Sequence, residues 1–281
     1  MTRRHMLAAW LPQPAESFPD IRSVEPDLTV PILGAGAPGP GLRVTMHRTG
    51  FGEGVYHVLY LPRGWRPRRR YPIIVEYAGN GNYSNQFGDV STGKPEGSNL
   101  GYGISGGVGF IWLCLPYVDP QRQSNAITWW GSPESTLEYA AGAIKETCER
   151  FGGDRRRVLL CGFSRGSIAC NYLGLRNAET TKLWRAFVCY SHYDGVRPWP
   201  QYPDSDRASA HARLERLGKR PQFICHERDV DDTRRYLAST GIHGNFTLAA
   251  LPYRNHNDAW TLRPITLRKT LREWVHRALS G

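Results

Sequence analysis

Ser164 lies at the centre of a Gly-x-Ser-x-Gly pattern at residues 162–166. A buried apolar run, 157–161, leads into this pattern, and a helical stretch, 167–170, follows it. A sharp turn between strand and helix holds the serine in a strained backbone geometry, and the glycines allow neighbouring chain segments to approach closely. The helix N-terminus favours a developing negative charge beside the serine. We therefore predict that Ser164 is a nucleophile.

A serine hydroxyl needs a general base, normally histidine, and a carboxylate that fixes the tautomer of that histidine. At turns of this kind the chain order is serine, acid, histidine. His256 follows a predicted strand at 246–251 and precedes the last helix, so it is expected at the carboxyl edge of the sheet. Other histidines are less suitably placed: His276 lies inside that helix, His243 lies before the strand, and His5, His47 and His57 precede the nucleophile.

Asp229 is the predicted acid, because it follows a strand that begins at Gln222 and lies between the serine and the histidine in the chain. Asp231 and Asp232 are close enough to take its place, although one of them can instead cap the next helix. Asp194, after the preceding strand, is a further alternative.

Acyl transfer places negative charge on a carbonyl oxygen, which backbone N–H groups must stabilise. One donor is expected to be the amide of Arg165, directly after the nucleophile. The second is expected in the glycine-bearing loop 78–83, where Asn80 is preferred and Gly79 or Gly81 are alternatives.

Several side chains at the same edge are candidates for substrate contact. The segment 84–107 is rich in Gly, Asn and Ser, which suits a loop that lines a pocket. The aromatic pair before a predicted helix is suited either to hold a sugar, phenolic or polymer acyl group or simply to pack. The candidates are Gly79, Tyr83, Trp129, Trp130 and His192, with Tyr193 and Trp199 near the last of these.

Strands and helices alternate along most of the chain. Strands are predicted at 42–47, 55–61, 71–77, 109–116, 158–163, 186–190, 222–225 and 246–251. Helices are predicted at 133–151, 167–175 and 232–239 and at the end of the chain. This alternation predicts an α/β fold with a mostly parallel sheet and helices on both faces. Residues 42–281 form the predicted catalytic domain, and residues 1–41, rich in proline and glycine, an extended N-terminal tail.

The composition of the 281 residues excludes some classes of protein. With 40% hydrophobic and 22% charged residues, the chain is expected to be globular. No apolar run approaches 18 residues, so no membrane span is expected. The net charge of +11 suits an anionic partner, but no nucleic-acid-binding module is recognisable. The six cysteines form no metal pattern and are expected to be buried thiols, with disulfides left open. Location, cytoplasmic or secreted, and oligomeric state are not predicted.

Three motifs give the chain a resemblance to a known superfamily: Gly-Phe-Ser-Arg-Gly at 162–166, His-Glu-Arg-Asp ending at Asp229, and Asn-His-Asn-Asp around His256. Over residues 42–280 the chain resembles the α/β-hydrolases, especially feruloyl and acetylxylan esterases, polyhydroxybutyrate depolymerase-like proteins and prolyl-oligopeptidase catalytic domains. His226 replaces the usual glycine of the acid loop, and Ala78-Gly79 replaces the usual His-Gly. The resemblance implies ester hydrolysis through an acyl-enzyme, with no metal or organic cofactor.

The sequence thus predicts a serine esterase that acts on a small or polysaccharide-linked ester, without nucleic-acid or membrane partners. A prolyl-oligopeptidase-like peptidase is one alternative, although the 41-residue tail is too short for the propeller of such enzymes. A catalytically silent protein that binds an anionic polymer is the other. The acyl and alcohol specificities are not predicted.

Overall fold

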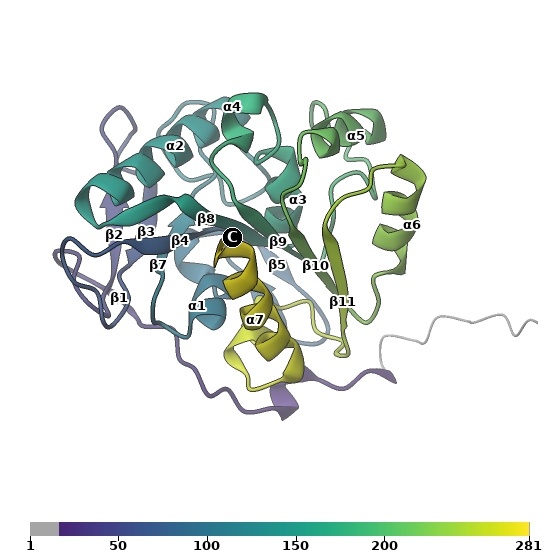
Figure 1. The fold of residues 1–281 in the computed structure, drawn as a ribbon, viewed down its shortest axis with the longest axis horizontal. Helices are drawn as coiled ribbons and strands as arrows, with labels where there is room; N and C mark the ends of the chain where they lie inside the picture. The colour runs from purple at the N-terminus through teal and green to yellow at the C-terminus, as the bar shows by residue number, and fades with distance from the viewer. Residues whose placement is uncertain (1–16, 281) are drawn as a thin grey trace, which may run out of the picture.

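A nine-stranded sheet forms the centre of the molecule in the computed structural model, which describes residues 17–280 (Figure 1). In spatial order its strands are β1 (Leu33–Gly34), β2 (Arg43–His47), β3 (Tyr56–Tyr60), β7 (Ile111–Leu115), β4 (Tyr71–Tyr77), β8 (Gly153–Phe163), β9 (Ala186–Tyr190), β10 (Gln222–Glu227) and β11 (Phe246–Leu251). The β2–β3 and β3–β7 pairs are antiparallel, and the other pairs are parallel. The predicted mostly parallel sheet is therefore confirmed.

Helices cover both faces of this sheet, as Figure 1 shows. The helices are α1 (Leu100–Ser105), α2 (Pro133–Arg150), α3 (Arg165–Tyr172), α4 (Ala178–Thr181), α5 (Arg207–Glu215), α6 (Asp231–Thr240) and α7 (Thr266–Ser280). One core joins the sheet to α2, α3, α5 and α6, and a second core joins its other face to α1 and α7. Along β4 the side chains alternate between the two cores, with Ile73 and Val75 in the first and Ile74 in the second. Burial on both faces explains why the sequence of β4 is an almost continuous apolar run.

Local signals set the bounds of the predicted elements. At the start of α2, the Ser132 hydroxyl accepts a hydrogen bond from the amide of Ser135 at 3.2 Å, and Pro133 takes the first helical position. Both features stabilise a helix N-terminus. The strands β4, β9 and β11 have the bounds that the sequence predicts.

The segment 84–107 is more ordered than the predicted loop. It contains a hairpin of β5 (Tyr83–Ser84) and β6 (Val90–Ser91), a 3₁₀ turn at Pro95–Gly97 and the buried helix α1. The Glu76 carboxylate in β4 accepts the amides of Leu100 at 3.0 Å and Gly101 at 2.7 Å, and so holds the start of α1. Helix α1 was not predicted because its glycines have low helix propensity. They permit close packing, since a Cβ at Gly101 would lie 2.2 Å from the Trp112 ring.

The N-terminal segment within the described residues packs against the domain. Ile21 is buried in the core that contains α7, and β1 pairs with β2 in the sheet. Residues 1–16 of the predicted tail lie outside the described residues, and the division at residue 41 stays a prediction. All six cysteines are free thiols, and five of them are buried. Within residues 17–280 no helix combines the length and apolar character that crossing a membrane requires.

His57 gives the fold a testable pH dependence. It is 2% exposed, and burial lowers its pKa to about 3, with a further contribution from Arg48. Between about pH 6.5 and pH 3 the unfolded chain therefore binds a proton that the native state does not, so stability falls as the pH falls. We expect His57→Gln to remove up to about 1.4 kcal/mol per pH unit from this slope. Urea unfolding at pH 6.5, 5.5 and 4.5 measures it, and identical slopes for the two proteins would contradict the assignment.

Candidate active site

Ser164 lies on a strained turn between β8 and α3. Its φ of 55° and ψ of −115° are unusual for a residue with a side chain. The flanking glycines have a steric reason, because a Cβ at Gly162 would lie 2.2 Å from the carbonyl oxygen of Gly166. A Cβ at Gly166 would lie 2.1 Å from the carbonyl oxygen of Tyr77. The turn therefore holds the serine in one position at the carboxyl edge of the sheet.

His256 meets the serine from the loop that follows β11. Its Nε2 lies 3.1 Å from Ser164 Oγ, although the two residues are 92 positions apart in the chain. The imidazole packs against three rings: Phe163, whose centroid is 4.7 Å away, Tyr83 at 5.0 Å and His192 at 5.4 Å. The structure thus brings together two of the three residues predicted to be catalytic.

Glu227 is the carboxylate beside the histidine. Its Oε1 forms a short contact with His256 Nδ1, and both of these atoms also lie close to the Ser191 hydroxyl, at 2.9 Å and 2.8 Å respectively. Burial by itself raises the pKa of Glu227, but the hydrogen bond and charge of His256 outweigh it and hold the pKa below its ordinary value. The carboxylate form of Glu227 is therefore favoured at neutral pH.

Asp229 does not contact His256, so its predicted position in the site is wrong. The strand β10 continues to Glu227, two residues beyond its predicted end, and Arg228 then turns the chain with a φ of 69°. Asp229 is exposed, and its Oδ1 accepts the amide of Asp231 at 3.1 Å, in the first turn of α6.

The alternative carboxylates are also occupied elsewhere. Buried Asp194 forms an ion pair with Arg213, with N–O distances of 2.8 Å and 3.0 Å. Asp231 and Asp232 lie in the first turn of α6, where each is near an arginine of the same helix. Sequence reasoning missed Glu227 and Ser191; the available signal was a glutamate at the end of a strand whose first four residues are buried.

The two sets of backbone amides that the sequence predicts as oxyanion donors lie in the first turn of α3 and in the loop 78–83. The amide of Arg165 belongs to the first turn of α3, where N–H groups have no acceptor within the helix. In the loop 78–83 the amide of Gly81 donates to the Ile127 carbonyl at 2.8 Å, which removes Gly81 from the alternatives. The side-chain oxygen of Asn80 accepts the amide of Trp129 at 2.7 Å, which fixes this loop.

The Arg165 side chain connects the loops around the turn. It is 1% exposed, and its guanidinium lies 4.1 Å from the Tyr117 ring centroid. It donates to four backbone carbonyls, those of Gly93 at 2.8 Å, Ala126 at 3.3 Å, Ala78 at 3.4 Å and Trp129. Burial lowers the pKa of Arg165 to about 10, which leaves the group charged at neutral pH.

A recess of about 180 Å³ opens beside Ser191 and Glu227, between the ends of β9 and β10. His192, Trp199 and Glu227 are among its lining residues. His192 lies where the sequence places it, and burial, together with the neighbouring His256, lowers its pKa to about 4, so its ring is neutral at pH 7.

The two adjacent tryptophans behave differently from one another. Trp130 is 1% exposed, and its indole donates to the Arg165 carbonyl at 3.2 Å, so its predicted substrate contact is wrong because it is a core residue. Trp129 is partly buried, with its ring centroid 4.9 Å from that of Trp199 and 4.7 Å from that of Tyr202.

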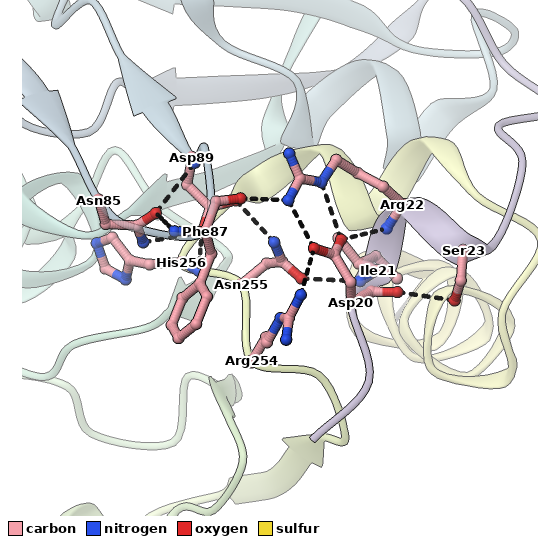
Figure 2. Close-up of polar contacts among 10 residues, drawn as sticks. All are labelled: Asp20, Ile21, Arg22, Ser23, Asn85, Phe87, Asp89, Arg254, Asn255 and His256. Carbon is pink, nitrogen blue, oxygen red and sulfur yellow. Dashed lines mark hydrogen bonds and ion pairs between the residues drawn. The ribbon is translucent and has the colours of Figure 1, made fainter. Parts of the chain in front are cut away.

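Buried polar side chains hold the histidine loop, as Figure 2 shows. Asp89 is 1% exposed and lies just before β6. Its Oδ2 accepts the backbone amide of His256 and the Asn85 side chain, and its Oδ1 accepts the Asn255 side chain, each at 2.9 Å. One carboxylate therefore fixes the backbone at the histidine itself.

The N-terminal segment braces the same loop from the other side (Figure 2). The amide of Ile21 donates to Asn255 Oδ1 at 2.8 Å, and Asp20 pairs with Arg254 at 3.1 Å. Arg22 donates to the Phe87 carbonyl, in the turn that carries Asp89. Segments from three distant parts of the sequence thus converge on the residues before His256. Among residues 17–280, no group of three or more His, Cys, Asp and Glu side chains is arranged to hold a metal ion.

Known proteins resemble this chain in structure rather than in sequence. No protein-family model and no curated protein matches it. The esterase Est22 has 15% sequence identity and a TM-score of 0.54, with 85% of this chain and 80% of Est22 covered. A Bacteroides ovatus ATCC 8483 protein assigned as a dipeptidyl aminopeptidase IV has 13% identity and a TM-score of 0.56, with 84% of this chain and 35% of that protein covered.

A thermostable esterase has 16% identity and a TM-score of 0.49, with 84% of this chain and 62% of that protein covered. The chain therefore spans less than two thirds of the length of two of these three proteins. At such low identity the likeness concerns the fold. The predicted α/β-hydrolase fold is confirmed.

The hold of Asp89 on the histidine loop can be tested without an activity assay. An amide in place of this carboxylate loses the charge-assisted hydrogen bonds, so we expect Asp89→Asn to lower the free energy of unfolding by about 2 kcal/mol. Amide hydrogen exchange of residues 253–257 should become faster. Asp119→Asn is the matched control, because Asp119 also accepts several hydrogen bonds within a loop, from Gln123 and Ser124. Exchange at 253–257 that responds equally to both substitutions would contradict the role of Asp89.

Proposed function

We propose that this protein is a serine hydrolase that cleaves carboxylic esters through an acyl-enzyme. One observation carries the proposal: His256 Nε2 lies 3.1 Å from the Ser164 hydroxyl while Nδ1 contacts the Glu227 carboxylate. Nucleophile, base and orienting acid in this relation are recognised by geometry on many unrelated folds. Here the acid is Glu227, in place of the Asp229 that the sequence favoured.

The imidazole of His256 takes the proton of Ser164 as Oγ attacks the ester carbonyl carbon. The carbonyl oxygen becomes negative, and the amide of Arg165, with that of Asn80 or Gly79, donates hydrogen bonds to it. The tetrahedral intermediate then collapses, and the imidazolium gives its proton to the departing alcohol. A water molecule, deprotonated by the same imidazole, attacks the acyl-enzyme and releases the acid, which restores Ser164.

Glu227 has the role of accepting the Nδ1–H of His256, so that Nε2 is free to take the serine proton. It also stabilises the imidazolium that forms. The Ser191 hydroxyl donates to the same carboxylate oxygen at 2.9 Å and so helps to fix it. The depressed pKa of Glu227 agrees with this role, because an ionised carboxylate is needed.

An ester is the proposed substrate, small or attached to a polysaccharide, and the proposed reaction needs no cofactor. Two of the structural neighbours are named as esterases, Est22 and the thermostable enzyme. The recess beside the triad, lined in part by His192, is the proposed site for one side of the ester, and Tyr83, whose ring packs against His256, is a further proposed substrate contact. A peptidase activity is the second candidate, since the Bacteroides ovatus protein is assigned as an aminopeptidase.

Ser164→Ala is expected to reduce hydrolysis of p-nitrophenyl acetate and butyrate by at least about 10³-fold, because nothing else in the site replaces the nucleophile. A fluorophosphonate probe should label the wild-type protein and not the variant. Circular dichroism and the melting temperature should show that the variant stays folded. Assaying peptide anilides beside an ester series from acetyl to feruloyl distinguishes a peptidase from an esterase. Unchanged ester turnover in the variant would refute the assignment of Ser164 as the nucleophile.

Glu227→Gln and Asp229→Asn distinguish the two candidate acids. We expect Glu227→Gln to lower kcat by about 10²–10⁴-fold, because the tautomer of His256 is no longer fixed. Asp229→Asn is the comparison, with an expected change in kcat of less than about twofold, because the Asp229 carboxylate, although it lines the recess, accepts the amide of Asp231 and has no contact with His256. A larger loss for Asp229→Asn than for Glu227→Gln would restore the sequence-based assignment.

A further inference from the structure

A strongly basic recess lies at the edge of the sheet opposite the triad. The parallel strands β8, β9 and β10 end at the active-site edge, so all three also begin at one common edge (Figure 1). At this second edge a recess of about 550 Å³ is bounded by the first residues of β8 and by the connections that lead into β9 and β10. Its charged lining residues are Arg155, Arg156, Lys182, Arg185, Lys219 and Arg220.

The fold brings these cations together from three separate segments of the chain. Between the pairs Tyr71–Gly153 and Ile73–Val158 the register of β4 and β8 shifts, so that Arg155 and Arg156 lie on extra residues of β8. Arg220 is half-buried and donates to the carbonyls of Trp184 at 3.0 Å and Leu217 at 3.2 Å. These hydrogen bonds join the connection before β10 to the connection before β9.

The lining of the recess contains hydrogen-bond donors and no acidic side chain, although Lys182 forms an ion pair with Glu179 beside it, at 2.6 Å. Trp184 also borders the recess, but its indole N–H is buried, so the six cations are the donors that a ligand can reach. Trp184 itself is only 3% exposed. Like charges that share a concave site repel one another, and a bound anion relieves that repulsion.

We propose that this recess binds a compact anion with several charges, of the polyphosphate type. Planar arginine forks match phosphate oxygens, and charge-assisted hydrogen bonds of this kind are strong. A concave site on which three segments converge suits a compact ligand.

Two other anionic partners fit the recess less well. Single-stranded nucleic acid would need exposed aromatic rings for base stacking, and the aromatic residue here, Trp184, is buried. A membrane surface would need exposed apolar side chains, and none of the large exposed hydrophobic residues among residues 17–280 lines the recess.

Calorimetric titration with tripolyphosphate at 50 mM and 200 mM NaCl tests the site directly. The double variant Arg156→Gln/Lys219→Gln is expected to bind at least about tenfold more weakly than the wild type, because charge-assisted hydrogen bonds are lost. Lys269→Gln/Arg277→Gln is the matched control, with the same loss of charge on the exposed surface of α7. It should keep the wild-type affinity within about twofold, since screening confines the effect of distant surface charges.

Equal weakening by both double variants would overturn the proposal, because only the net charge would then matter. The absence of binding at 50 mM NaCl would also overturn it. Phosphatidylserine vesicles and an oligothymidylate are tested as competing ligands. If either one binds and tripolyphosphate does not displace it, the recess is assigned to a membrane or to a nucleic acid instead. Binding is measured without any ester, so the result is independent of the proposed hydrolase activity.

Discussion

The hydrogen bond between His256 and Ser164 is the contact on which the rest of the site depends. It joins the Ser164 turn, which has a strand before it and a helix after it, to the irregular loop that carries His256. The Ser164 turn is fixed by β8 and α3, whereas the loop that carries His256 depends on partners from distant segments, such as the Pro19 carbonyl that accepts the amide of Arg254. Two buried carboxylates also fix this loop. Asp89 accepts the backbone amide of His256, and Asp258, two residues after the histidine, accepts the backbone amide and the side-chain N–H of Asn99. Carboxylates thus fix the chain at His256, through Asp89, and two residues after it, through Asp258.

A buried charge also organises the side of the site where the acyl oxygen is proposed to bind. Taking a guanidinium out of water is unfavourable unless its donors are satisfied. Arg165 meets that condition with four carbonyl acceptors and the face of the Tyr117 ring. The same contacts connect the loops at Ala78 and Trp129 to the nucleophile turn. The residue after the serine is therefore proposed to supply one backbone donor, and its side chain fixes the neighbouring loop that is proposed to supply the second.

The sequence predicts those parts of the site that depend on local patterns. The turn at Ser164 has a local pattern of glycines between a strand and a helix, and the chain order points to His256. Glu227 was missed because the choice of acid depends on where β10 ends. A shift of two residues in that end exchanges Asp229 for Glu227. Nothing local indicates Asp89 either, since its partner at His256 is 167 positions away. Helix α1 was missed because its glycines, which lower helix propensity, serve close packing.

The parallel sheet separates the two proposed sites. The carboxyl ends of β8, β9 and β10 carry Ser164, Ser191 and Glu227, and the starts of the same strands carry the cations of the recess. Six residues of β10 at about 3.3 Å each keep the two edges about 20 Å apart. That is more than the Debye length of about 8 Å at physiological ionic strength. Solvent-exposed charges at this separation are largely screened, and a compact anion in the proposed recess would not reach Ser164, so the two proposed sites can be tested separately.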